Sequence, residues 1–226
     1  MKPNGLISAR TRPTSERGEA TRQRLLEVAI QVFAARGFDG ARTRDIAEAA
    51  KTNPISIAYY FGNKQGLYYA AAKHVAARWA AFGKPLVQQA RTSMARPGVT
   101  HRELVRILCT LLRHFVRLIL GDFLPDCYGK FLSQAASGPA REFSLVDRSL
   151  APLRGALSEA IAALTGESAT SSATKARAVS IIGSCICFRR DRPAVLRALK
   201  WKQLGAKELK VIEMAIEANI QAMFSR

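Results

Sequence analysis

Long uninterrupted hydrophobic segments are missing from this chain of 226 residues. The best candidate, residues 107–120, contains Arg113, His114 and Arg117, and no run approaches the roughly 18 apolar residues of a membrane span. The first residues, MKPNGLISARTRPTSERGEATRQ, carry positive charge but no apolar core of a secretory signal. We therefore expect a cytoplasmic protein without a membrane-spanning segment.

Metal-binding, redox and catalytic motifs are equally scarce. Three scattered histidines offer no ligand cluster, and no C-x-x-C pair exists among the four cysteines, Cys109, Cys127, Cys185 and Cys187. We interpret these cysteines as reduced core thiols, with a redox sensor or a metal site as the alternative, and we expect no metal and no cofactor. No Ser-His-Asp order, glycine-rich phosphate loop or paired-carboxylate motif occurs, so an enzyme is not expected.

Acidic residues are few in this chain. Lys and Arg together number 35 and Asp and Glu 17, which gives a formal net charge of +18. No acidic residue lies between Glu48 and Glu103, a stretch that holds eight cations. These are Lys51, Lys64, Lys73, Arg78, Lys84, Arg91, Arg96 and Arg102. Such an excess favours a polyanionic partner, either nucleic acid or an anionic membrane surface, with solubility alone as the bland explanation.

Alternation of period two is nearly absent, and apolar residues instead recur about every 3.6 positions from residue 21 to 38, which predicts a helix. Gly37 lies where a left-handed C-terminal cap of this helix is expected. Two short helices should follow: residues 44–50, capped by Thr43, and a helix that starts at Asn53-Pro54 and ends at Phe61. Asn63 should cap a longer helix that runs past Trp79. Later helices are expected at about 101–120, 122–136, 142–164, 172–189, 193–201 and 206–224. The sequence therefore predicts an all-α fold.

Three helices within about 45 residues, of which the second and third are joined by a tight turn, are typical of a helix-turn-helix. Ile57 and Phe61 should face inward and leave the rest of the third helix for other surfaces. Lys64 follows in the first turn of the next helix, where a cation opposes the helix dipole unless an anion binds there. We expect it to bind a phosphate, although a solvated lysine is the simpler alternative.

Residues 20–72 resemble the DNA-binding domain of the TetR family of bacterial regulators. The resemblance lies in F-x-x-x-G-F (33–38), T-R-D-I-A (43–47) and Y-Y-F-x-N-K (59–64). It implies an all-α homodimer with an N-terminal three-helix DNA-binding domain and a larger C-terminal domain for ligand binding and dimerisation. We expect a basic arm at 1–17, the helix-turn-helix domain at 18–66 and the helical effector domain at 67–226.

The resemblance also implies roles for nine residues at the DNA. Thr43, Tyr60 and Lys64 are expected to hold backbone phosphates, and Arg44 to reach a base edge. The exposed positions of the recognition helix are Asn53, Pro54, Ile55, Ser56 and Tyr59. The turn usually contains a glycine where this chain has Lys51, so a left-handed backbone there would be strained.

The C-terminal region carries a second resemblance. The run CFRRDRPAVLRALKW (187–201) and the final amphipathic helix are similar to the CerR-type C-terminal domain of one TetR subgroup, which implies control of transporter or efflux genes by small molecules. Arg113 and Arg117 share a helix face that suits an anionic effector, with a solvated face as the alternative. An apolar effector cavity, or plain core, is suggested by the aromatic residues Phe115, Phe123, Tyr128, Phe131 and Phe143.

We expect segments 142–164 and 172–189 to form a four-helix dimer interface, since they are rich in small and aliphatic residues around Gly183. The prediction is a ligand-responsive repressor that binds a pseudo-palindromic DNA operator as a homodimer and has no membrane partner. Arg10 and Arg12 of the arm are candidates for a flanking minor groove, with a passive tail as the alternative. The remaining hypothesis is a non-specific basic protein that binds nucleic acid through charge alone.

Overall fold

The computed structural model describes residues 16–121, 125–135 and 140–225, and this part of the chain contains ten helices and no strand. Most of the expected arm, including Arg10 and Arg12, lies outside the described residues, as do Phe123 and the side chain of Phe143. None of the described helices is long and apolar enough to cross a membrane. The all-α prediction is confirmed.

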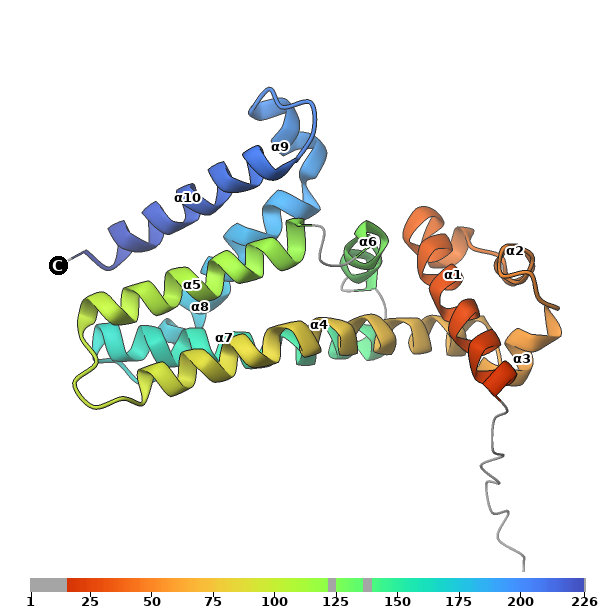
Figure 1. The fold of residues 1–226 in the computed structure, drawn as a ribbon, viewed down its shortest axis with the longest axis horizontal. Coiled ribbons are helices and arrows are strands. Elements are labelled where there is room, and N and C mark those ends of the chain that lie inside the picture. The colour runs from red at the N-terminus through yellow and green to blue at the C-terminus, as the bar shows by residue number, and fades with distance from the viewer. Residues whose placement is uncertain (1–15, 122–124, 136–139, 226) are drawn as a thin grey trace, which may run out of the picture.

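Three helices form one end of an elongated molecule (Figure 1). They are α1 (Glu16–Gly40), α2 (Thr43–Ala49) and α3 (Ile55–Phe61). The regular part of α1 is interrupted at Gly37, whose φ of 71° is a backbone conformation that glycine adopts without steric cost. Gly37 therefore ends the regular part of the helix at the expected cap position and turns the chain toward α2.

The helix α4 (Lys64–Met94) links this end to the rest of the molecule and runs along the base of the C-terminal helices (Figure 1). Asn63 caps it as predicted, because its side-chain oxygen accepts a hydrogen bond from the Gly66 N–H at 2.8 Å. At 1.5 Å per residue, α4 is about 46 Å long. It passes without a break through the expected domain boundary at residue 66, so the two ends of the molecule share one continuous helix.

The C-terminal helices pack beside and above α4. They are α5 (His101–Leu120), α6 (Asp126–Ala135), α7 (Ala140–Thr165), α8 (Ser172–Arg190), α9 (Arg192–Ala198) and α10 (Ala206–Met223). Thr100 and Glu103 form a reciprocal capping box at the start of α5. Arg113 and Arg117 of α5 bind carboxylates of α10, which attaches the last helix to the bundle.

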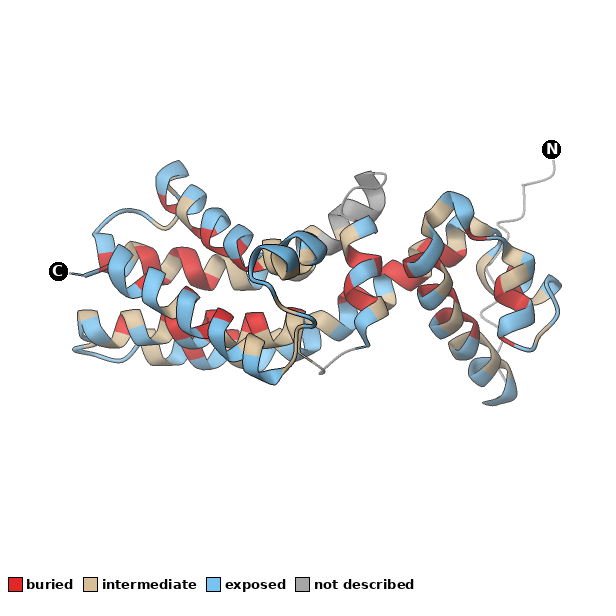
Figure 2. Ribbon diagram, turned by 90° about the horizontal axis from the view of Figure 1, so that it is seen from above, coloured by how far each residue is buried: buried red, intermediate tan, exposed pale blue. Residues whose placement is uncertain are grey.

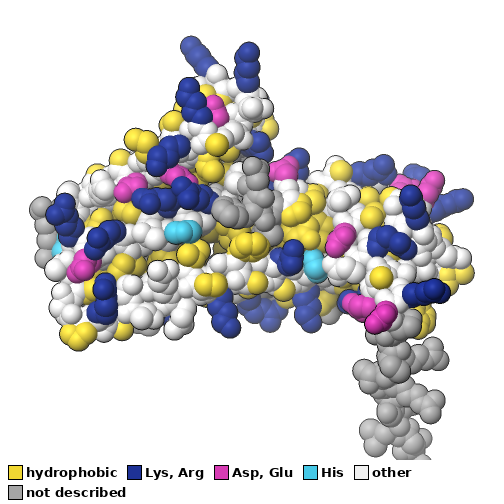
Figure 3. Space-filling model, viewed as in Figure 1, with side chains coloured by type: hydrophobic (Ala, Val, Ile, Leu, Met, Phe, Trp, Pro, Cys, Tyr) yellow, Lys and Arg dark blue, Asp and Glu magenta, His cyan; other side chains and the backbone are white. Residues whose placement is uncertain are grey.

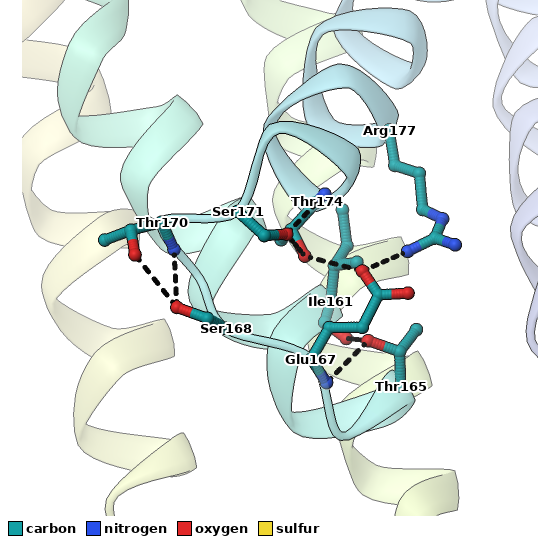
Figure 4. Close-up of polar contacts among 8 residues, drawn as sticks. All are labelled: Ile161, Thr165, Glu167, Ser168, Thr170, Ser171, Thr174 and Arg177. Atoms are coloured by element: carbon teal, nitrogen blue, oxygen red, sulfur yellow. Dashed lines mark hydrogen bonds and ion pairs between the residues drawn. The ribbon is translucent and has the colours of Figure 1, made fainter.

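The α7–α8 corner is fixed by a network of short polar side chains (Figure 4). Ser171 caps α8 by accepting from the Thr174 N–H at 3.1 Å. The buried Thr174 hydroxyl donates to Glu167 Oε2 at 3.2 Å, and Arg177 binds the same oxygen at 2.7 Å. The connection between α7 and α8 is therefore an ordered turn that holds two long helices together.

Buried residues fall into two clusters, one at each end of the molecule (Figure 2). The larger joins α4, α5, α7, α8 and α10. The smaller contains the cores of α1, α2 and α3, and it also includes four residues of α6: Tyr128, Phe131, Leu132 and Ala135. A helix from the C-terminal half thus completes the core of the N-terminal end.

Two local predictions were wrong. The helix α2 begins at Thr43 rather than after it, and its N-cap residue Arg42 has no side-chain capping bond, so Thr43 is a first-turn residue and not the cap. The helix α9 ends at Ala198 instead of residue 201. The chain turns there through Lys200, at φ 55°, and the Trp201 N–H donates to Leu196 O at 2.9 Å, which closes the helix.

Candidate nucleic-acid interface

The turn between α2 and α3 has the geometry of a Schellman C-cap. The Lys51 N–H donates to Glu48 O and the Thr52 N–H to Ala47 O, both at 2.9 Å. Lys51 has a φ of 50°, the left-handed conformation that usually requires glycine. The backbone strain that the sequence predicts at Lys51 is therefore present. The two hydrogen bonds of the turn offset it and fix the angle between α2 and α3.

The helix α3 has one buried anchor and a broad exposed face. Ile57 is 2% exposed and packs into the N-terminal core, whereas Ile55 and Tyr59 are 72% and 63% exposed. Asn53 Oδ1 accepts from the Ile55 N–H at 2.9 Å, so Asn53 stabilises the first turn as expected, although the regular helix begins two residues later. Two large, solvent-exposed apolar side chains at this end of the molecule indicate a binding surface.

Polar groups flank this exposed face. The hydroxyls of Ser56 and Thr52 lie 3.1 Å apart and couple α3 to the turn. Tyr60 is half-buried and packs edge-to-face on Tyr59, with ring centroids 4.8 Å apart. The two tyrosines therefore support each other, and the orientation of Tyr59 is set by packing.

Lys64 lies at the N-terminus of α4, next to the end of α3. Its Nζ donates to Asp39 O at 3.4 Å and lies 4.5 Å from the centre of the Phe38 ring. These contacts hold an ammonium group where the helix dipole is already positive, an arrangement that favours a bound anion.

Arg44 is exposed in the first turn of α2, and Thr43 beside it is half-buried. The neighbouring Asp45 binds Arg36 at 2.6 Å, which offsets the one negative charge in that turn. Lys and Arg side chains are spread over the end of the molecule that contains α1 to α3 (Figure 3). All nine residues predicted to contact DNA lie on α2, the turn after it, α3 or the first residue of α4.

The packing of α6 against this end was not predicted from the sequence. Phe131, fully buried, lies 5.0 Å from Tyr68 between ring centroids, and the Tyr128 hydroxyl lies 3.3 Å from His74 Nε2. Burial, and then the charge of Arg78, lower the pKa of His74, so the imidazole is neutral at pH 7. The sequence left two interpretations open for the aromatic residues of α6, an effector cavity or plain core, and Tyr128 and Phe131 belong to the core that supports the helix-turn-helix.

The helix α6 also contacts α8, through Arg189. Its Nη1 donates to Ile119 O and its Nη2 to Asp126 O, the latter at 2.8 Å. A Cβ atom at Gly129 would overlap the Arg189 guanidinium, so a larger residue at this position would displace the Arg189 side chain. The helix α6 therefore lies between the core of the helix-turn-helix and the α7–α8 hairpin.

The candidate effector residues are not gathered around one cavity. Arg113 and Arg117 pair with Glu217 and Glu213 of α10, and Phe115 is buried in the larger core. Tyr128 and Phe131 are in the smaller core, with α1 and α4.

The cysteine side chains are free thiols. Cys109 and Cys185 are buried, and burial raises the pKa of Cys109 to about 11 and that of Cys185 to about 12. Both groups therefore remain protonated and unreactive at neutral pH.

A cavity of about 510 Å³ opens among α4, α5, α6, α7 and α8. Its walls include Trp79, Ile119, Leu132, Leu150, Ile182 and Ile186. Its size is in the range of small-molecule sites, and one wall is formed by α6, the helix that also packs on α1. The cavity could not be predicted from hydrophobic periodicity, because its walls come from five helices that are distant in the sequence.

The three N-terminal helices define a helix-turn-helix domain, and the families that the chain matches are transcriptional regulators, which are not enzymes. Residues 25–71 match the family described as bacterial regulatory proteins, tetR family, and residues 104–225 match the C-terminal domain of the HTH-type transcriptional dual regulator CecR. The chain belongs to the TetR family and has a CecR-type C-terminal domain. The C-terminal domain is therefore of the CecR type and not of the expected CerR type.

Individual relatives agree with this assignment. The chain is 26% identical over 205 residues to the dual regulator CecR of Shigella flexneri, which covers 90% of this chain and 91% of that protein. It is 33% identical over 94 residues, 42% of each chain, to the transcriptional repressor NicS of Pseudomonas putida. Among solved structures, AibR in complex with isovaleryl coenzyme A and operator DNA has a similar fold, with a TM-score of 0.61 at 18% identity over 90% of this chain and 98% of that one.

Proposed function

We propose that the protein is a ligand-responsive repressor that binds a pseudo-palindromic operator as a homodimer. The observation that carries this proposal is the exposed face of α3, where Ile55 and Tyr59 project from a helix that is anchored by Ile57. The helix α3 is about 10 Å long at 1.5 Å per residue, short enough to enter a major groove about 12 Å wide.

Each predicted contact has a role that fits its position. Arg44 and the exposed residues of α3 read base edges, and Thr43, Tyr60 and Lys64 hold phosphates on either side. The residues assigned to the groove from α3 and the turn before it are Asn53, Pro54, Ile55, Ser56 and Tyr59. Because Ile55 and Tyr59 carry no formal charge, we expect apolar contacts to contribute to their selectivity, for example with thymine methyl groups.

Dimerisation through α8 is supported by the residues that this helix exposes. Val179 is 57% exposed, and a Cβ added at Gly183 would meet nothing within 4 Å. Both residues also line the cavity, so a second copy packed here would lie against it. The exposed side chains on this face are mostly small: Ser172, Ala173, Ala176, Val179, Ser180 and Ser184. Small residues allow two helices to approach closely, so a second copy packed here would form an isologous interface of α7 and α8 from each subunit.

Ligand control is supported by the position of the cavity. A molecule in the cavity would contact α6, whose other face packs on α1, so binding would favour one position of α6 over another. Arg113 and Arg117 then have a structural role, because they hold α10 through ion pairs. The aromatic side chains predicted for the effector site belong to the two cores and do not line the cavity: Phe115, Tyr128 and Phe131. We propose transporter or efflux genes as targets, on the strength of the CecR-type domain.

Selection of bound sequences from a random DNA pool tests this function. We expect an inverted repeat whose half-sites are separated by about one helical turn, roughly 10 base pairs. The Arg44→Ala variant should lose preference at one base pair in each half-site, at a cost of about 1–3 kcal/mol. If no sequence is enriched and all binding disappears as salt is raised, the protein is the non-specific basic binder that the charge alone also allows.

A further inference from the structure

Two residues that line the α4–α8 cavity, Trp79 and Arg189, each carry an unusual buried polar group. The indole Nε1–H of Trp79 and the guanidinium Nε–H of Arg189 are both buried, and neither has a hydrogen-bond acceptor in the described residues. They are the two buried side-chain polar atoms of the described residues for which this holds. Because buried N–H groups in proteins are nearly always paired, two orphaned donors at one cavity point to a ligand that carries acceptors.

The other nitrogens of the Arg189 guanidinium are hydrogen-bonded, and these bonds fix its position. Both terminal nitrogens are held by backbone oxygens, those of Ile119 and Asp126, so the guanidinium has a fixed orientation. Asp126 is the nearest carboxylate, at 3.4 Å, and it is shared with Lys130 at 2.9 Å and Arg192 at 3.5 Å. Three cations, of which Arg189 lines the cavity, therefore surround one carboxylate, which leaves an excess of positive charge beside Arg189.

The rest of the cavity is apolar or already neutralised. Arg154, which also lines it, binds Asp147 at 2.8 Å and so brings no net charge. The walls between are aliphatic: Ile119, Leu132, Leu150, Ile182 and Ile186. A ligand that fits has an apolar body and one acidic group, since a cation would meet the positive charge around Arg189 and a polar body would lose its hydration without replacement.

We propose that this cavity binds apolar monocarboxylates, with the carboxylate accepting from Arg189 Nε and with Trp79 Nε1 as a second donor. The inference rests on the proposed function in that the cavity is taken to be the effector site. A charge-assisted hydrogen bond to a guanidinium is stronger than a neutral one, so selectivity should come from the acidic group and affinity from the hydrophobic body.

Fluorescence and calorimetry of the full-length protein test this inference. The chain has two tryptophans, so the Trp201→Phe variant leaves Trp79 as the sole indole reporter at the cavity. The probes are decanoate and 4-butylbenzoate, with decan-1-ol and decylammonium as neutral and cationic controls of matched size. We expect the two carboxylates to shift Trp79 emission and to bind at least tenfold more tightly than decan-1-ol, and decylammonium not to bind. Equal binding of decanoate and decan-1-ol, or failure of both carboxylates to bind, would overturn the inference.

Two variants locate the acidic group. Trp79→Phe keeps the aromatic wall and removes one donor, and Arg189→Gln removes the charge and the Nε–H. Measured by calorimetry, each should weaken decanoate binding about tenfold or more and change decan-1-ol binding less than twofold. Arg190→Gln, an exposed neighbour whose side chain is 69% accessible, is the matched control and should change neither. Because Arg189 also ties α6 to α8, Trp79→Phe supplies the test if Arg189→Gln unfolds, and unchanged decanoate binding by Trp79→Phe would then reject the two-donor site.

Operator binding by the same preparations separates the two proposals. A protein that selects an operator but binds no carboxylate retains the regulatory function and loses the proposed ligand class. A protein that binds decanoate beside Trp79 but selects no DNA sequence retains the ligand class and loses the regulatory function.

Discussion

Phe131 of α6 packs against Phe33 of α1, with ring centroids 6.3 Å apart and planes tilted by 45°. Both side chains are fully buried. One lies in the stretch that matches the TetR DNA-binding family and the other in the stretch that matches the CecR C-terminal domain. The core of the DNA-binding end is therefore completed by a residue from the effector end, and the stability of the two parts must be coupled.

Phe131→Ala should for this reason destabilise the helix-turn-helix as well as α6. A large buried aromatic replaced by alanine costs about 3–5 kcal/mol, and we expect a loss of this size in the free energy of unfolding. Hydrogen exchange should show faster opening of α1 and α3 amides. Met214→Ala, at a side chain that is 59% exposed on α10, is the control and should change stability by less than about 0.5 kcal/mol. Exchange confined to α6 would show that the two ends are independent.

Lys51→Gly should stabilise the protein. Lys51 has a φ of 50°, which costs a residue with a Cβ about 1–2 kcal/mol, whereas glycine adds about 0.5–1 kcal/mol of chain entropy to the unfolded state. The expected net gain is about 0.5–1 kcal/mol in thermal or urea unfolding. Lys51→Ala removes the same charge but keeps the Cβ, so it should show no gain. Equal stabilisation by both variants would mean that charge repulsion, and not backbone strain, is relieved.

Sequence reasoning succeeded at several positions with local signals, although it failed for the cap of α2 and the end of α9. Gly37, Asn63 and the turn after α2 are each determined by a few neighbouring residues, and the structure has them as expected. The role of Phe131 was not accessible in this way, because its partners in α1 and α4 are distant in the chain and a buried aromatic looks the same in a core and in a pocket wall. The orphaned donors of Trp79 and Arg189 are visible only when five helices are in place.

Lys64→Ala should weaken binding of cognate and random DNA by a similar factor. Loss of one phosphate contact should also lower the slope of log affinity against log salt by about one. Titrations at three or more salt concentrations measure this slope. Lys84→Ala is the matched control, since Lys84 is exposed on the same helix but about 30 Å further along it at 1.5 Å per residue. A slope unchanged by Lys64→Ala, or lowered equally by Lys84→Ala, contradicts the phosphate role.

Gly183→Glu should separate a dimer into folded monomers. The position has open space around its Cβ within the subunit, so the new side chain fits the monomer, but it would place a charge in the proposed α8 contact. We expect a dimer for the wild type and a monomer for the variant in sedimentation at micromolar concentration. The control is Gln88→Glu, the same charge on the exposed face of α4, which should remain dimeric. A wild type that sediments as a monomer would exclude the two-groove arrangement.

Glu167→Gln should lower thermal stability near neutral pH and lose its effect in acid. The hydrogen bond from Arg177, together with one from Thr174, holds the pKa of Glu167 below its ordinary value of 4.5 in the folded protein. A carboxylate with a lowered pKa stabilises the fold at pH values above its unfolded pKa, and this contribution is lost as the pH falls through the folded pKa. The difference in Tm between wild type and variant should therefore be constant from pH 7 to about 5 and shrink below about 4.5. Glu48→Gln makes the same charge change on an exposed residue of α2, outside this network, and should give no such trend. A difference in Tm that persists in acid would mean that Glu167 acts through packing and that the α7–α8 corner does not depend on its charge.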